Sequence, residues 1–102
     1  MEIRVHAACA RAAALADHAR RRLLYVLMPR RHQVQRIEVH LGDTRSRRGG
    51  REGYCKVQLQ LLHAGVTTVV DVSKDLYDAI DRAVDHAGRL AAERLRGAPL
   101  AA

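Results

Sequence analysis

The residues with the clearest chemical potential in this sequence are arginines, and they are concentrated in its first half. Residues 1–56 contain 13 Lys/Arg and 5 Asp/Glu, whereas residues 57–102 contain 5 and 6, so the net charge of +7 belongs to the first half. A guanidinium presents a planar fork of N–H donors that fits phosphate oxygens. The pattern predicts a polyanionic partner, with nucleic acid favoured over a membrane surface. The alternative is that the arginines only keep a small protein soluble.

The densest group of arginines lies at the end of an apolar helical pattern. Arg20, Arg21 and Arg22 are consecutive, and Arg30 and Arg31 follow shortly afterwards. Several guanidinium groups at a helix end and in the loop beyond it can grip an RNA backbone without reading its bases. We interpret this group as a phosphate-binding surface, with a solvated basic face as the alternative.

A second group of arginines falls in a stretch rich in glycine. Arg45, Arg47, Arg48 and Arg51 lie within residues 43–53, which contain no large apolar side chain. The stretch is not a phosphate-binding P-loop, because it lacks the Gly-Lys-Ser/Thr sequence and a helix after it. We predict a mobile loop here, which either becomes ordered on RNA or has no binding role.

Side chains suited to catalysis or metal binding are scattered. The six histidines fall in different segments, and neither the H-x-x-x-H nor the C-x-x-C spacing of a metal site is present. Asp78, Asp81 and Asp85 share a helical segment, but nothing in the pattern indicates the burial that acid–base catalysis requires. We therefore expect a non-enzyme with no catalytic residue, no metal and no cofactor. His40 is interpreted as a solvated side chain, with a charge interaction with RNA as the alternative.

The elements that would position these residues follow from the spacing of apolar side chains. Alternation with a period of two predicts strands, and a period of 3.6 predicts helices. Strands are expected at 1–7, 34–42, 54–62 and 66–72, and helices at 10–27 and 75–96. Pro29 ends the first helix, and Ser73 or Asp75 caps the last one. The predicted order is β-α-β-β-β-α.

This order predicts an α+β fold with a four-stranded mixed sheet and two helices packed on one face, a layout like that of double-stranded RNA-binding domains. The helical crossover favours a parallel first pair of strands, and the short turns favour antiparallel pairing for the rest. Leu62 and Val69 are expected to face solvent. The residues of the fourth strand expected to face the helices are Val66, Thr68, Val70 and Val72. We expect one domain over residues 1–97 and a disordered tail at 98–102.

The last helix and the strand before it also carry a family resemblance. The segment Asp75-Leu76-Tyr77-Asp78-Ala79-Ile80-Asp81 follows the strand residues 67–73, and residues 36–43 form a second strand. Together these segments resemble the ribosome hibernation-promoting factor family, in its short form, whose members are also called ribosomal subunit interface proteins. The resemblance covers most of the chain and implies the same fold as the apolar pattern.

The resemblance implies a function on the ribosome. The chain would bind structured rRNA of the small subunit near the decoding channel, exclude messenger and transfer RNA, and so inhibit translation sterically during hibernation or stress. Basic residues on both helices would make the contacts, with ribosomal proteins as further neighbours. The predicted RNA-binding residues are Arg20, Arg22, Arg30, Arg31, Arg36, Lys74, Arg82 and Arg89.

The last helix departs from a purely basic surface, because its charges balance. The spacing predicts intrahelical ion pairs between Asp78 and Arg82 and between Asp85 and Arg89. Its part in RNA binding is therefore expected to be smaller than that of the first helix.

Two other functions stay open from the sequence. One is a general double-stranded RNA-binding module, and the other is a small protein-interaction module that docks through Leu62 and Val69. The only aromatic residues are three tyrosines, too few for a sheet that stacks single-stranded bases. No apolar run approaches the roughly 20 residues that cross a bilayer, and the N-terminus lacks a secretory apolar segment. We expect a cytoplasmic protein with no membrane partner, and the sequence makes no prediction about self-association.

Overall fold

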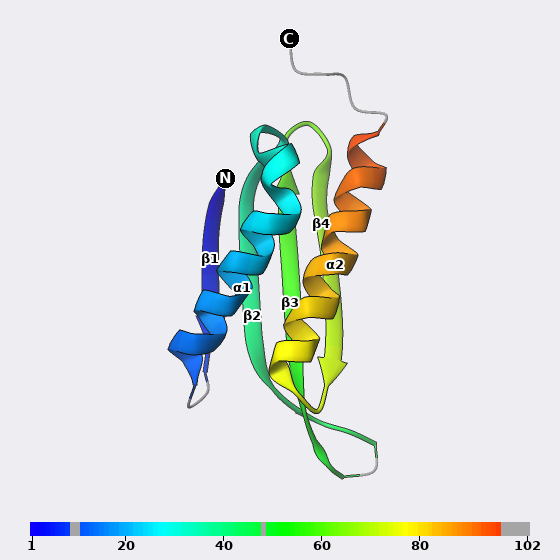
Figure 1. The fold of residues 1–102 in the computed structure, drawn as a ribbon. Coiled ribbons are helices and arrows are strands. Elements are labelled where there is room, and N and C mark those ends of the chain that lie inside the picture. Colours follow the sequence, from blue (N-terminus) through cyan, green and yellow to red (C-terminus); the bar gives the residue numbers. More distant parts are fainter. Residues whose placement is uncertain (9–10, 48, 97–102) are drawn as a thin grey trace.

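The computed structural model describes residues 1–8, 11–47 and 49–96, and it shows a layer of helices on one face of a sheet (Figure 1). The elements in chain order are β1 (Glu2–Ala7), α1 (Ala12–Leu27), the 3-10 helix η1 (Met28–Gln33), β2 (Val34–Arg45), β3 (Arg51–Leu61), β4 (Gly65–Ser73) and α2 (Leu76–Leu95). The strands lie in the order β1-β2-β3-β4. β1 is parallel to β2, and the other neighbouring strands are antiparallel. The predicted α+β fold is confirmed.

The strand directions decide where the two helices end. β1, β2 and β4 run in one direction and β3 runs in the other. α1 follows β1 and α2 follows β4, so both helices run back along the sheet and finish at the end where β1 and β4 begin (Figure 1). We call this the η1 end, with residues 28–33 and 94–96. The opposite end, with residues 43–53 and 73–76, is the hairpin end.

Aliphatic side chains fill the space between the sheet and the helices. Because side chains alternate along a strand, one face of each inner strand points towards the helices, and each helix packs one apolar stripe against that face. α2 contributes four alanines to this stripe, and small side chains allow a helix to lie close to a sheet. The largest fully buried side chains are Leu15, Leu23, Leu27, Ile37, Leu59, Ile80, Val34, Val39, Val57, Val84 and Cys55.

The predicted orientation of β4 is wrong by one residue. Thr67 and Val69 are buried, whereas Val66, Val70 and Val72 are exposed. The pairing with β3 explains this, because Val69 lies opposite the buried Val57 and paired residues share a face of the sheet. A slip of one residue moves every side chain of a strand to the other face. The predicted apolar patch of Leu62 and Val69 is therefore wrong, and a valine row stands on the open face instead.

The predicted loop at residues 43–53 is mostly strand. β2 and β3 stay paired as far as Arg45 and Arg51, and Ser46 N–H donates to the Gly50 carbonyl oxygen at 2.8 Å. Backbone hydrogen bonds extend this hairpin beyond the core, so no apolar side chain is needed there. Gly49 has φ of 84°, a conformation that favours glycine at the turn.

The ends of the helices depart little from the prediction. Asp75 caps α2, because its carboxylate accepts from the Tyr77 N–H at 2.9 Å. η1 was not predicted; it continues directly from α1 with Pro29 in its first turn, where a missing N–H costs nothing.

The predicted tail at 98–102 lies outside the described residues. Within the part of the chain that the structure describes, no helix is both long and apolar enough to cross a membrane.

Burial makes the thiol of Cys55 a poor nucleophile. Loss of solvent, with the nearby Asp71 carboxylate as a smaller cause, raises the pKa of Cys55 to about 12. Because thiolate is the reactive form, we expect iodoacetamide at pH 8 to leave Cys55 unmodified in the folded chain and to modify it in urea. Mass spectrometry of a Cys9→Ser chain measures this. Equal rates of modification with and without urea would contradict the burial.

Candidate nucleic-acid interface

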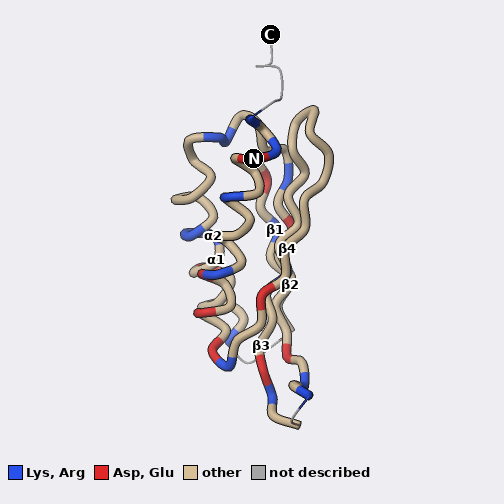
Figure 2. The backbone as a smooth tube through the Cα atoms, turned by 90° about the vertical axis from the view of Figure 1, so that its right-hand side faces the viewer, with Lys and Arg blue, Asp and Glu red and all other residues tan. Residues whose placement is uncertain are grey.

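Cations gather at the η1 end, where Arg31, Arg94 and Arg96 are exposed and Arg30 is half-buried. Arg30 and Arg31 belong to η1, and Arg94 and Arg96 stand at the end of α2. Figure 2 shows several basic positions together at this end of the molecule. Arg30 and Arg31 were predicted from the sequence, but Arg94 and Arg96 were missed. They become neighbours of η1 only because both helices finish at the same end of the sheet.

Two further cations lie along the outer surface of the helices. Arg20 on α1 and Arg89 on α2 are exposed. Together with the four at the η1 end they form a set that has no ion pair within the described residues. We call this set the helix-layer basic group; its members are Arg20, Arg30, Arg31, Arg89, Arg94 and Arg96. Guanidinium groups without an ion pair can meet phosphate oxygens, although Arg31 Nη1 already donates to the Met28 carbonyl oxygen at 3.0 Å. Glu93 is the acid that lies among them in the chain.

Arg22 has a different role, because it joins the two helices. Its Nη2 donates to Asp85 Oδ1 at 2.8 Å, and its Nε lies 3.4 Å from Asp81 Oδ1. His18 Nε2 lies 2.7 Å from the same Asp81 oxygen. The Arg22 side chain is only 33% exposed. Two carboxylates therefore offset its charge, and it is the predicted RNA contact least able to reach a phosphate.

We expect Arg22→Gln to lower the free energy of unfolding by about 0.5–1 kcal/mol, the range for a partly exposed ion pair. The matched control is Arg21→Gln, which removes only the exposed pair between Arg21 and Asp17 on one helix. Urea unfolding followed by circular dichroism measures both. An equal loss of stability for the two variants would show that the bridges between the helices add nothing.

The outer face of α2 confirms one predicted ion pair and contradicts the other. Arg82 Nε lies 3.2 Å from Asp78 Oδ2, as the spacing predicts. Asp85 instead pairs with Arg22 across the helices, which leaves Arg89 free of it. Arg82 is 62% exposed, so it can exchange this pair for a phosphate at small cost.

Arg36 lies on the opposite side of the sheet from the helices. Its neighbour Ile37 is buried under the helices, so Arg36 points to the open face. Its Nε is 3.5 Å from Glu2 Oε2. The pKa of the Glu2 carboxyl is lowered chiefly by Arg4, which donates to it, and in part by Arg36. A single flat RNA surface cannot contact Arg36 and the helix-layer basic group together.

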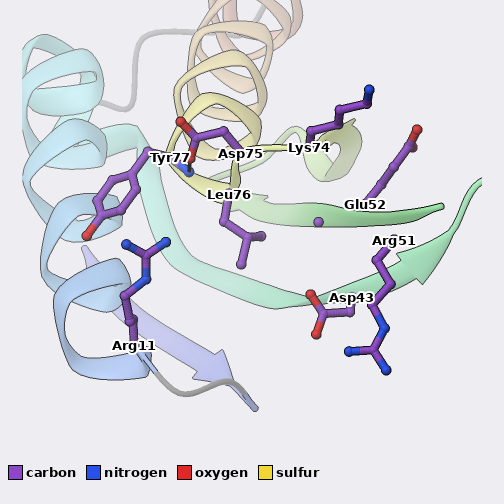
Figure 3. Close-up of a pocket in the computed structure, with 9 residues that line it drawn as sticks. Arg11, Asp43, Arg51, Glu52, Lys74, Asp75, Leu76 and Tyr77 are labelled. Atoms are coloured by element: carbon purple, nitrogen blue, oxygen red, sulfur yellow. Dashed lines mark hydrogen bonds between the residues drawn. The ribbon is translucent and has the colours of Figure 1, made fainter.

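Lys74 lies at the hairpin end, beside a cleft of about 510 Å³. Figure 3 shows Arg11 and Tyr77 on one side of this cleft and Lys74 with Arg51 on the other. Three acids, Asp43, Glu52 and Asp75, line the same cleft as these three cations. The cleft is therefore balanced in charge. At the start of α2 the Asp75 carboxylate already accepts from the Tyr77 N–H, so this helix N-terminus offers no vacant anion site.

The hairpin carries the second predicted group of arginines. Arg45 and Arg51 lie directly opposite each other in the β2–β3 ladder, and Arg47 follows in the turn. Arg48 lies outside the described residues. Like charges on directly opposed residues destabilise a hairpin, so an anionic partner at the tip would relieve this repulsion. The hairpin tip is thus a second basic surface, separated from the η1 end by the length of the sheet (Figure 1).

The arrangement of sheet and helices is shared with solved structures. No protein-family model matches the sequence, and no curated protein matches it. The N-terminal domain of Protein Y from Thermus thermophilus has a TM-score of 0.68 and 26% identity, over 88% of this chain and 94% of that one. A ribosomal subunit interface protein from Coxiella burnetii has a TM-score of 0.75 and 14% identity, over 91% of this chain and 96% of that one. The resemblance to the ribosome hibernation-promoting factor family is confirmed.

The likeness to hibernation factors concerns the whole domain rather than one motif. The two comparisons cover 88% and 91% of this chain, which is more than the last helix and its preceding strand could account for. In this chain α1 and α2 run parallel, and this course brings four members of the helix-layer basic group, Arg30, Arg31, Arg94 and Arg96, together at the η1 end.

Proposed function

We propose that this chain is a ribosome-associated hibernation factor that binds structured rRNA of the small subunit near the decoding channel. The observation that carries the proposal is the likeness to a Protein Y domain and to a ribosomal subunit interface protein, over 88% and 91% of the chain. The helix-layer basic group supplies the chemistry, because its six guanidinium groups have no acidic partner among the described residues. The protein acts as one domain over residues 1–97, in the cytoplasm.

Inhibition in this proposal is steric. Guanidinium groups contact phosphate oxygens and release counterions, which gives affinity without reading bases. Arg20, Arg30, Arg31 and Arg89 are the sequence-predicted contacts that keep this role, and Arg94 and Arg96 join them. The bound domain occupies space that messenger and transfer RNA need, so translation stops without a catalytic step, a metal or a cofactor.

Co-sedimentation with purified small ribosomal subunits tests the proposal. We expect the chain to pellet with the subunits at low salt, and log affinity to fall by roughly 0.7–0.9 per log of salt for each phosphate contacted. Added chain should also suppress translation of a reporter messenger RNA in a cell-free system. Failure to pellet at any salt concentration would refute the proposal. Equal competition by unrelated double-stranded RNA would point to a general RNA-binding module.

The valine row on β4 favours one other function, a protein-interaction module. Val66 is 57% exposed, Val70 53% and Val72 40%, and β4 is an edge strand with a free side for another strand. This mode of binding would be nearly insensitive to salt, because apolar contacts release no counterions. The same sedimentation series therefore separates it from phosphate binding.

A further inference from the structure

The open face of the sheet carries a cluster of metal-ligand side chains at the β1–β2 seam. His6 lies directly opposite His40 in the parallel ladder, and Glu38 precedes His40 by two residues on the same face. The ligand atoms of the three side chains all lie within 4.8 Å of one another. His6 Nε2 is 3.0 Å from Glu38 Oε2, and His40 Nε2 is 3.9 Å from the same oxygen.

We propose that His6, Glu38 and His40 bind a divalent transition-metal ion, with Zn²⁺ as the best fit. Two imidazoles and one carboxylate are a donor set that zinc sites use when one position is left open. Bond lengths of about 2.0–2.2 Å place tetrahedral ligands about 3.4 Å apart. The two separations from Glu38 Oε2, 3.0 and 3.9 Å, bracket this value. Side-chain rotation that unstacks the two rings would bring both imidazoles onto the same ion.

The surroundings of the cluster are compatible with a bound cation. The two imidazole rings are stacked, with centroids 4.6 Å apart and planes inclined by 14°. The donor lone pair of an imidazole lies in its ring plane, so at least one of the two rings must turn for both to point at the same ion. The nearest cations along the open face are Arg4, which is held by Glu2, and Lys56, which lies opposite His40 on β3.

The open coordination position would face solvent. His6 and His40 line a hollow of about 420 Å³ with Tyr54, and the side chains are 51% and 39% exposed. Water fills the fourth position in this geometry. The ion would also join β1, an edge strand that pairs with β2, to the middle of the sheet. Metal binding should therefore protect the β1 amides from hydrogen exchange.

Calorimetric titration with ZnCl₂ tests the proposal. A Cys9→Ser chain is used throughout, so that its thiol cannot supply the binding. We expect one ion per chain, and a loss of affinity of about tenfold or more in His40→Gln and in Glu38→Gln, because each removes one of three ligands. The matched control is His32→Gln, an exposed histidine of η1, which should bind as the parent chain does. Affinity should also fall in acid, because protons compete for the imidazoles.

A second measurement does not depend on the variants. In the same parent chain, amide hydrogen exchange with and without ZnCl₂ should show protection confined to β1 and the adjoining part of β2. Absence of binding up to about 100 µM Zn²⁺, well above the affinity of a useful three-ligand site, would overturn the proposal. So would equal affinity in His40→Gln and in the parent chain, or protection centred elsewhere. Loss of the metal site should leave ribosome co-sedimentation unchanged, so this proposal and the proposed function fail separately.

Discussion

Replacing Arg30, Arg31 and Arg96 by glutamate is expected to weaken binding to the small ribosomal subunit by about 100-fold or more at low salt. All three side chains belong to the η1 end, and none has an ion pair within the described part of the chain. Three attractive charges become repulsive, and the slope of log affinity against log salt should become shallower by about 0.7–0.9 for each phosphate that is no longer neutralised. Sedimentation of a labelled chain over a salt series measures both quantities.

The matched control reverses the same number of charges at the hairpin end. Arg45→Glu, Arg47→Glu and Arg51→Glu together also exchange three positive charges for three negative ones. We expect this variant to bind more weakly by a small factor only, because its charges act from a distance across screened solvent. A larger drop in affinity for the hairpin variant than for the η1-end variant would show that RNA binds at the hairpin end instead. Circular dichroism of both variants checks that each is still folded.

Leu23→Ala is expected to have the largest effect on stability, about 2–5 kcal/mol. Leu23 is fully buried on the stripe of α1 that packs against the core, and truncation leaves a cavity that the rigid sheet cannot close. Domains of this size have only about 5–15 kcal/mol of stability. The midpoint of urea unfolding should therefore fall steeply.

The next residue along the chain gives the control for this variant. Leu24 is 40% exposed, so Leu24→Ala removes the same atoms from a site that is already partly in water. We expect a decrease in unfolding free energy of less than about 1 kcal/mol for it. Equal decreases at the two positions would mean that Leu23 does not face the sheet.

Most of the fold could be predicted from the order of apolar patterns. Alternation around Ile37 and Val57 and the helical stripe around Leu23 and Ile80 are strong local signals, and the buried residues confirm them. The orientation of β4 could not be predicted in the same way. Valines occur at both even and odd positions of that strand, so its pattern fits either face, and only the register with β3 decides between them.

The candidate site was less predictable, because it depends on contacts between elements. The sequence shows that Arg22 is basic, but not that Asp81 and Asp85 of another helix offset its charge. The neighbourhood of His6 and His40 was also missed, although a signal for it existed. Both face outward in strands predicted to be parallel, and they share a register position once those strands pair.

The arginines of the η1 end also depend on how elements are arranged, but here the arrangement was predictable. Arg94 and Arg96 could have been joined to Arg30 and Arg31 from the sequence alone. A parallel first pair of strands followed by two antiparallel pairings makes β1 and β4 run in the same direction. The helices that follow them must then end together, so charges at both helix ends belong on one surface.

A cryo-electron microscopy reconstruction of the small ribosomal subunit with this chain bound tests the central claim most directly. We expect density for the domain in the channel near the decoding site, with α1, η1 and the end of α2 against rRNA phosphates and the open face of the sheet turned away. Density elsewhere on the subunit, or a domain that meets rRNA through the hairpin or the valine row of β4, would contradict the claim.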